Sequence, residues 1–105
     1  MPDFVFAYHG GDAPSSPEEG ARQRAGFMEW IGGLGDAVVD PGTPLGPSTF
    51  VDGTGVLADR GPEPMTGFSV VRADSISAAV DIALGSPFRD IGGTIQVAEI
   101  RAMPA

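Results

Sequence analysis

The last third of the chain carries a strand–helix–strand pattern of apolar residues. Residues 68–73 (FSVVRA) are rich in β-branched and aromatic side chains, which favour a pleated strand. Five apolar residues then recur at spacings of three and four, as one face of a helix does: Ile76, Ala79, Val80, Ala83 and Leu84. Residues 94–100 (TIQVAEI) predict a second strand, with Ile95 and Val97 on one face.

The ends of this helix are also marked. Asp74 or Ser75 offers a side-chain oxygen to the free N–H groups of the first turn. Gly85 is expected to take the left-handed conformation just past the last turn, and Pro87 prevents continuation.

The first third repeats the plan. Residues 3–9 alternate, with bulky aromatics on one face (Phe4, Phe6, Tyr8) and Val5, Ala7 and His9 on the other. Ser16 as cap, Pro17 at the first helical position and Glu19 at the third form a capping box. The helix is expected to run to about Leu34 and to end at Gly35. Its expected inner stripe consists of Ala21, Arg24, Phe27, Met28, Ile31 and Leu34, with Trp30 toward one edge.

The middle of the chain predicts a strand and a hairpin. Residues 36–40 (DAVVD) form a strand that Pro41-Gly42 stops or bends. Asp52-Gly53 lies between the short apolar runs 48–51 and 56–59, which is a hairpin signal.

The resulting order is β-α-β, a hairpin, then β-α-β. This is the ferredoxin-like α+β pattern, with two helices on one face of a four-stranded antiparallel sheet, and we expect one domain over residues 1–105. The other sheet face, to which we assign Val5, Ala7 and Val71, is also apolar, and no predicted element is left to cover it. We therefore expect a homodimer in which two sheets pack face to face. The alternative is that these residues are tolerated singly at the surface.

Composition narrows the function classes. A net charge of −8 disfavours nucleic acid and anionic membranes as partners. The chain has no cysteine and one histidine, so we expect no metal site, and we predict no cofactor. It shows no apolar run of membrane-spanning length and no leader pattern, so the predicted location is cytoplasmic.

Several stretches together resemble the YCII-related proteins. They are FVFAYHGG, SPEE, LGDAVVDPGTPLGPS, GFSVVRADSISAAVDIALGSP and GGTIQVAEI. The resemblance implies a dimeric α/β barrel, in which two sheets enclose a cleft. In that family a histidine and an aspartate are suspected to form an active site, and some relatives act on chlorinated or hydroxylated aromatics. His9 matches the YHGG motif and Asp40 the VDPG motif, whereas the DGPF signature of a sister branch is absent.

His9 and Asp40 are therefore the candidate catalytic residues. Histidine suits proton transfer near neutral pH, and Asp40 would orient the imidazole and stabilise its charged form. The alternative is that His9 is a partly buried structural residue, satisfied by a backbone carbonyl or by the Gly-rich loop, and that Asp40 only makes the turn before Pro41-Gly42.

Three further residues are candidates for substrate binding. Tyr8 and Trp30 could flank an aromatic ligand, and Arg72 could bind an anionic group. The alternatives are that both aromatics belong to the core and that Arg72 pairs with an acid near the sheet edge.

Three functions remain open from the sequence. The first is a cofactor-free isomerase or lyase that uses a His-Asp pair in a dimer cleft. The second is a non-catalytic module that binds a small aromatic or anionic molecule or another protein. The third is a stable scaffold, since a fold does not by itself choose a function.

Overall fold

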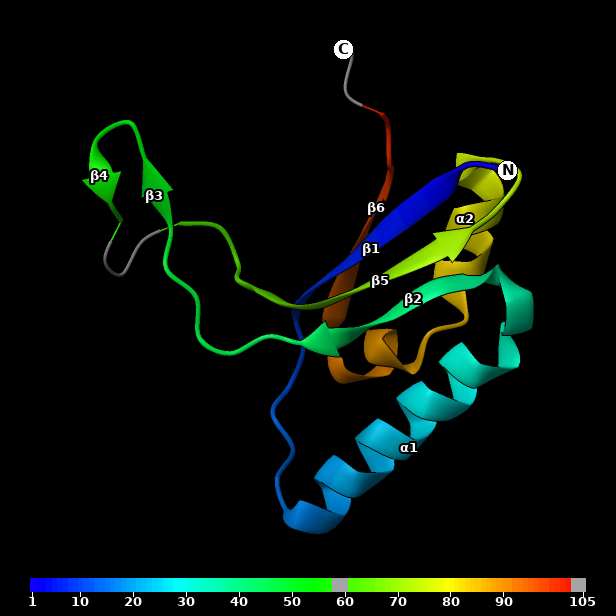
Figure 1. The fold of residues 1–105 in the computed structure, drawn as a ribbon. Helices are drawn as coiled ribbons and strands as arrows, with labels where there is room; N and C mark the ends of the chain where they lie inside the picture. Colours follow the sequence, from blue (N-terminus) through cyan, green and yellow to red (C-terminus); the bar gives the residue numbers. More distant parts are fainter. Residues whose placement is uncertain (58–60, 103–105) are drawn as a thin grey trace.

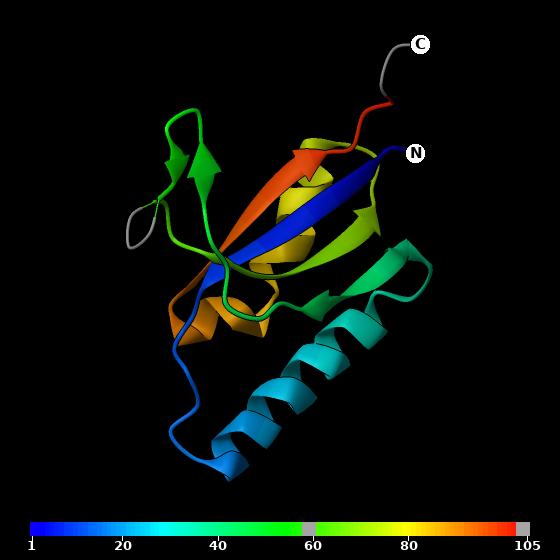
Figure 2. The ribbon, with the colours of Figure 1, turned by 60° about the vertical axis from the view of Figure 1, so that its left-hand side comes forward.

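The computed structural model describes residues 1–57 and 61–102. Its centre is a four-stranded antiparallel sheet formed by β1 (Asp3–Gly10), β2 (Val38–Pro44), β5 (Met65–Arg72) and β6 (Gly93–Glu99), in the spatial order β2-β5-β1-β6. Helices α1 (Pro17–Gly33) and α2 (Ile76–Leu84) lie on one face of this sheet (Figures 1 and 2). The short 3-10 helices η1 (Gly35–Ala37) and η2 (Pro87–Ile91) lead into β2 and β6. The predicted ferredoxin-like fold is confirmed.

The hairpin insertion lies between β2 and β5. Its strands are β3 (Val51–Asp52) and β4 (Gly55–Val56), and it projects away from the main sheet (Figure 1). Asp52 Oδ1 accepts a hydrogen bond from the Thr54 backbone N–H at 2.7 Å and so closes the turn. The strands are shorter than the predicted runs, and positions 58 and 59 of the second run lie outside the described residues.

The alternation along β1 is confirmed. Phe4, Phe6 and Tyr8 are buried beneath the helices, together with Ala79 of α2. Val71 of β5 was predicted on the other face, but it pairs with Phe4 and is buried in the same core. Val5, Ala7 and His9 point to the other face, because successive side chains of a strand alternate.

The start of α1 matches its sequence signal. Ser16 Oγ accepts a hydrogen bond from the Glu19 backbone N–H at 3.1 Å, and Pro17 is the first helical residue. The Glu19 carboxylate, however, accepts from Arg22 Nη2 at 2.5 Å, so it serves an ion pair on the helix surface. Arg22 lowers the pKa of Glu19 by this hydrogen bond.

The predicted inner stripe of α1 is only partly confirmed. Ala21, Arg24 and Met28 are exposed, whereas Phe27 and Ile31 face the sheet as expected. Leu34 also packs against the core as expected. Trp30 belongs to the inner face, because its ring stacks on Phe6 with centroids 6.3 Å apart and meets Phe27 edge to face at 5.6 Å. Burial of the large Trp30 indole against two aromatic rings contributes more free energy than burial of the small or flexible side chains of the predicted stripe.

Helix α2 begins at the Ser75 cap, whose Oγ accepts from the Ala78 N–H at 3.1 Å. The predicted left-handed conformation of Gly85 is wrong, because its φ is −86°. The chain continues there directly into η2, which Ser86 caps by accepting from the Phe88 N–H. The left-handed residue comes after η2 instead, at Gly92 with φ 78°.

Strand β2 continues through Pro41-Gly42 instead of stopping there. Its pairing with β5 shifts register twice, between Val38 and Asp40 and between Asp40 and Thr43, so the strand is bent as the alternative prediction allowed. Gly42 has φ 82°, and a Cβ at this position would lie 1.5 Å from the Phe68 carbonyl oxygen. Only glycine permits this close approach.

The sheet face opposite the helices is apolar along its middle strands. Val5 pairs with Val70, and Ala7 pairs with Phe68. The valines and Phe68 are half-buried by their neighbours in the sheet, and no described helix or strand packs across them (Figures 1 and 2). This uncovered face carries His9.

Candidate functional site

His9 lies near the end of β1, on the uncovered face, and both of its ring nitrogens have partners. Nδ1 is 3.2 Å from the Glu63 carbonyl oxygen, and Nε2 is 3.1 Å from the side-chain amide oxygen of Gln96. Glu63 lies just before β5 and Gln96 lies on β6, so the ring is held between segments on both sides of β1. This arrangement fixes the plane of the imidazole.

The protonation state of the imidazole is linked to the direction of the Gln96 amide. Facing two oxygen atoms, the ring must donate from both nitrogens, which only the imidazolium can do. In the neutral ring, Nδ1–H donates to the Glu63 carbonyl and Nε2 accepts, so the Gln96 amide turns and presents its NH₂ group. Gln96 can therefore stabilise either state of His9.

The backbone beside His9 is unusually close to its neighbours. Gly10 has φ 72°, and a Cβ there would lie 2.0 Å from a carboxylate oxygen of Glu63. The register of β1 against β5 shifts between Tyr8 and His9, and the Gly10 N–H donates to the Pro64 carbonyl at 3.4 Å. The glycine and the bulge together aim His9 at the segment that precedes β5.

Asp40 is not close to His9 within one chain. Asp40 pairs with Val70 of β5, whereas His9 pairs with Met65, so the two lie roughly 15 Å apart along the strand direction. The Asp40 carboxylate accepts from the Gly42 N–H at 2.8 Å, which is local turn chemistry. Within the chain, the partner of Nδ1 is the Glu63 carbonyl.

Tyr8 and Trp30 lie on the helix side of the sheet, opposite His9. The Tyr8 hydroxyl donates to Ser69 Oγ at 2.9 Å, and its ring meets Phe88 and Phe27 edge to face. Burial raises the pKa of Tyr8, and the hydrogen bond to Ser69 offsets part of this rise. Both aromatics thus belong to the packed interior.

Arg72 is the last residue of β5, an inner strand, at the end of the sheet far from His9. Its Nε lies 3.1 Å from Oδ1 of Asp3, and both side chains are partly solvent-accessible. The register places Arg72 opposite Asp3, while His9 is at the other end of the same strand. The structure therefore does not bring Arg72 to the histidine.

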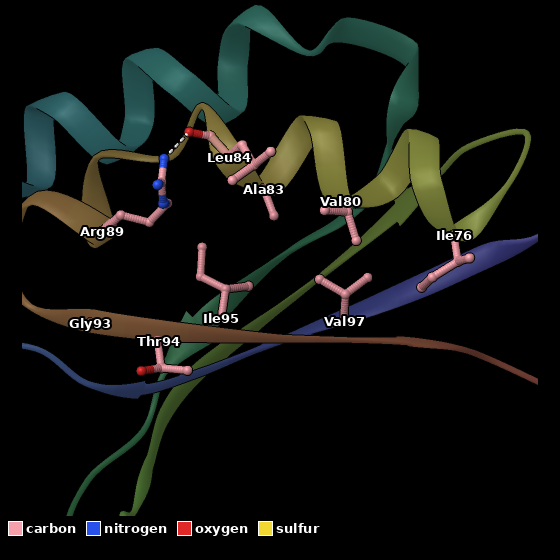
Figure 3. Close-up of a pocket in the computed structure, with 9 residues that line it drawn as sticks. All are labelled: Ile76, Val80, Ala83, Leu84, Arg89, Gly93, Thr94, Ile95 and Val97. Carbon is pink, nitrogen blue, oxygen red and sulfur yellow. Dashed lines mark hydrogen bonds between the residues drawn. The ribbon is translucent and has the colours of Figure 1, made fainter.

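Two hollows are present on the described surface. One, of about 610 Å³, lies at the root of the hairpin insertion and includes Phe50, Glu63 and Met65. The other, of about 460 Å³, is a groove between α2 and β6, with Val80 and Leu84 above Ile95 and Val97 and with Arg89 at one end (Figure 3). The first hollow adjoins His9 through Glu63, whose carbonyl contacts the imidazole.

Sequence reasoning missed Gln96 and Glu63. Gln96 was detectable as the polar residue between Ile95 and Val97, on the face of the strand that faces away from the helices. Glu63 acts through its backbone carbonyl, which no side-chain pattern reveals.

The described residues form neither a metal-binding cluster nor a membrane-spanning helix. Within residues 1–57 and 61–102, no cluster of three histidine, cysteine, aspartate or glutamate side chains is placed to hold a metal ion. None of the helices in the same residues is long and apolar enough to cross a membrane.

No protein-family model matches the sequence, and no curated protein matches it. Among solved structures, the chain is similar to 5-chloro-2-hydroxyhydroquinone dehydrochlorinase from Burkholderia phenoliruptrix AC1100, determined in complex with 2,5-dihydroxybenzoquinone. The TM-score is 0.59 with 20% sequence identity, over 94% of this chain and 93% of the other. At this identity the likeness shows a shared fold alone, and the YCII assignment and the dimeric α/β barrel stay predictions.

Proposed function

We propose that this protein binds a small hydroxylated ring compound against the uncovered sheet face and that His9 transfers a proton to or from it. The chain would then act as a cofactor-free lyase or isomerase. A second copy covers the face and turns it into a cleft, as the apolar pairs Val5–Val70 and Ala7–Phe68 favour.

One observation carries this proposal: the only histidine lies on the uncovered face with its ring orientation set by Glu63 and Gln96. A general base needs a fixed geometry and an available lone pair. With Nδ1–H bonded to the Glu63 carbonyl, the lone pair of Nε2 points to Gln96, whose amide a ligand hydroxyl can displace. The Glu63 carbonyl thus takes the orienting role that was predicted for Asp40, and Asp40 could join only from the second copy.

The proposed step removes a hydroxyl or ring proton. Nε2 accepts the proton from a substrate in its keto tautomer, in which the carbon that bears the leaving group is tetrahedral. The electron pair left on the substrate then moves through the ring to expel the anionic leaving group. The imidazolium then donates from both nitrogens, to the Glu63 carbonyl and to the Gln96 oxygen, as the side chains are oriented in the structure. In an isomerisation the imidazolium returns the proton to another ring carbon as the double bond moves. The dehydrochlorinase of similar fold supplies the ligand class, since it holds a dihydroxybenzoquinone.

The test uses chlorinated and unchlorinated hydroxyhydroquinones as substrates and 2,5-dihydroxybenzoquinone as a binding probe. We expect chloride release or ring isomerisation with the wild-type protein and a loss of about 100-fold or more with His9→Gln. Met28→Ala, on the exposed side of α1, is the matched control and should keep the full rate. Circular dichroism checks that each variant folds.

Other outcomes separate the alternatives. Binding of the probe without turnover, weakened by His9→Gln, would support the non-catalytic binding module. If the wild-type protein neither binds the probe nor converts any substrate of this class, the proposal is wrong.

A further inference from the structure

We infer that the free edge of β6 and the exposed flank of α2 form a second self-association surface, where two copies join their sheets edge to edge about a two-fold axis near Val97. The apolar and charged side chains that form this surface lie on the helix side of β6, opposite His9, and the inference does not rest on the proposed function. The occupant is a second copy of this chain.

The outer edge of β6 carries backbone N–H and C=O groups that can hydrogen-bond to another strand. The Ile100 N–H donates to the Asp3 carbonyl at 2.8 Å, and the register with β1 then runs without a shift to Gly10. Hydrogen-bonded pairs alternate in an antiparallel ladder, so Ala98, Gln96 and Thr94 bond to β1. The N–H and C=O groups of Ile95, Val97 and Glu99 therefore point outward.

The two edges of the sheet differ in protection. Strand β2, at the far edge, contains Pro41 and Pro44 and two register shifts, which are devices that block edge pairing. Strand β6 is regular, has no proline or lysine, and pairs with β1 alone in the sheet. An edge of this kind is a template for another strand.

An apolar stripe runs along the same edge on α2. Ile76, Val80 and Leu84 lie one helical turn apart and are 47%, 38% and 51% exposed. With Ile95 and Val97 of β6 they line the groove of about 460 Å³, in which Val80 lies above Val97 (Figure 3). The sequence pattern had assigned these three α2 residues to the core face, but Ala79 and Ala83 hold that place.

One two-fold axis at Val97 can bring both the apolar stripe of α2 and the edge of β6 against their own copies. A two-fold axis at Val97 pairs Val97 with Val97 and Ile95 with Glu99 of the other copy. The same axis sets Val80 against Val80 and Ile76 against Leu84. One symmetry operation thus satisfies the strand edge and the helix flank together, as an isologous interface requires.

Charge favours a second copy as the occupant. Arg89 lies at the Ile95 end of the groove, where its Nη1 donates to the Leu84 carbonyl at 2.5 Å (Figure 3). Glu99 shares the helix side of β6 with Ile95 and Val97, and within its own chain it lies 4.0 Å from Arg101. In the proposed register Glu99 of each copy sits opposite Ile95 of the other, next to Arg89, so two ion pairs form across the interface.

Disulfide trapping tests the register directly, because the chain has no cysteine of its own. Across the axis, two residues at position 97 have Cα atoms about 5.5 Å apart, within the range for a disulfide. We expect Val97→Cys to form a linked dimer under mild oxidation at micromolar concentration. Ala98→Cys, which lies next in the strand but on the other face, should form little disulfide-linked dimer. The inference is overturned if Val97→Cys stays unlinked or if both variants link equally.

A second experiment tests the helix flank and the charges. Light scattering should show that Val80→Asp has half the wild-type mass while keeping the wild-type circular dichroism, and that Met28→Asp, at an exposed apolar position on α1, keeps the full mass. Arg89→Glu and Glu99→Arg should each weaken association, and the double variant should restore it. A wild-type mass that Val80→Asp does not reduce would contradict the interface, whatever the His9 variants do.

Discussion

The hydroxyl of Tyr8 donates to Ser69 Oγ at 2.9 Å, and Ser69 in turn donates to the Pro41 carbonyl at 2.8 Å. This relay joins β1, β5 and the bend of β2 beneath the aromatic cluster, and Ser69 is fully buried. The Ser69 hydroxyl has a single O–H. Its oxygen accepts the hydrogen bond from Tyr8, and its O–H donates to the Pro41 carbonyl. The relay therefore satisfies the buried hydroxyls of Tyr8 and Ser69 and links them to the backbone of β2.

Ser69→Ala should destabilise the protein by about 1–3 kcal/mol. It leaves the buried Tyr8 hydroxyl without its partner, and an unpaired buried polar group costs its full desolvation. The Pro41 carbonyl also loses a hydrogen bond. Urea unfolding followed by Trp30 fluorescence measures the change. The matched control is Ser77→Ala, on the exposed side of α2, which should stay within about 0.5 kcal/mol of wild type. Equal effects of the two substitutions would show that the relay contributes nothing.

Stability should fall at alkaline pH because of Tyr8. Burial raises its pKa above the ordinary value of 10.0, so the folded state holds the phenolic proton more tightly than the unfolded state does. The resulting stability is fully present below pH 10.0 and is lost as the pH rises through the folded-state pKa.

Tyr8 is the only tyrosine, so ultraviolet absorbance of the tyrosinate reports it alone. The pKa of Tyr8 should be higher in the native protein than in a urea-unfolded sample. In the Tyr8→Phe variant, the free energy of unfolding should fall less steeply at alkaline pH. A native titration that coincides with the unfolded one would contradict the prediction.

Gly42→Ala should destabilise the protein strongly, by about 3 kcal/mol or more. The added Cβ would meet the Phe68 carbonyl oxygen, and φ 82° is strained for a residue with a side chain. The control is Gly46→Ala, where a Cβ meets open space and which should be nearly neutral. Thermal unfolding by circular dichroism compares the two variants, and similar melting temperatures would refute the close approach.

Ser16→Ala should cost about 1 kcal/mol, because the Glu19 N–H loses the cap oxygen that it donates to. Ser16→Asp should recover most of the loss, since a carboxylate accepts the same bond and interacts well with the positive end of the helix. Neighbouring Ser15→Ala serves as the control. Chemical unfolding free energies give the comparison, and the expectation fails if Ser15 and Ser16 behave alike.

Local order could be predicted from the sequence because its causes are local. The β1 alternation, the Ser16 and Ser75 caps and the end of α1 near Gly35 depend on neighbouring residues only, and the structure confirms them. Together with the element order, they were enough to predict the ferredoxin-like fold.

The relations between distant segments were decided by the tertiary structure alone. The register of β2 against β5 separates Asp40 from His9, and the register of β1 against β6 brings Gln96 to His9 instead. Packing of the aromatic cluster sets the rotation of α1, so that Trp30 faces the sheet. On α2, the small Ala79 and Ala83 face the core and Val80 faces outward. The spacing of residues along the chain predicts which of them share a face of a helix or strand. The direction in which that face points, and the residues that it contacts, depend on the packing of the helices against the sheet.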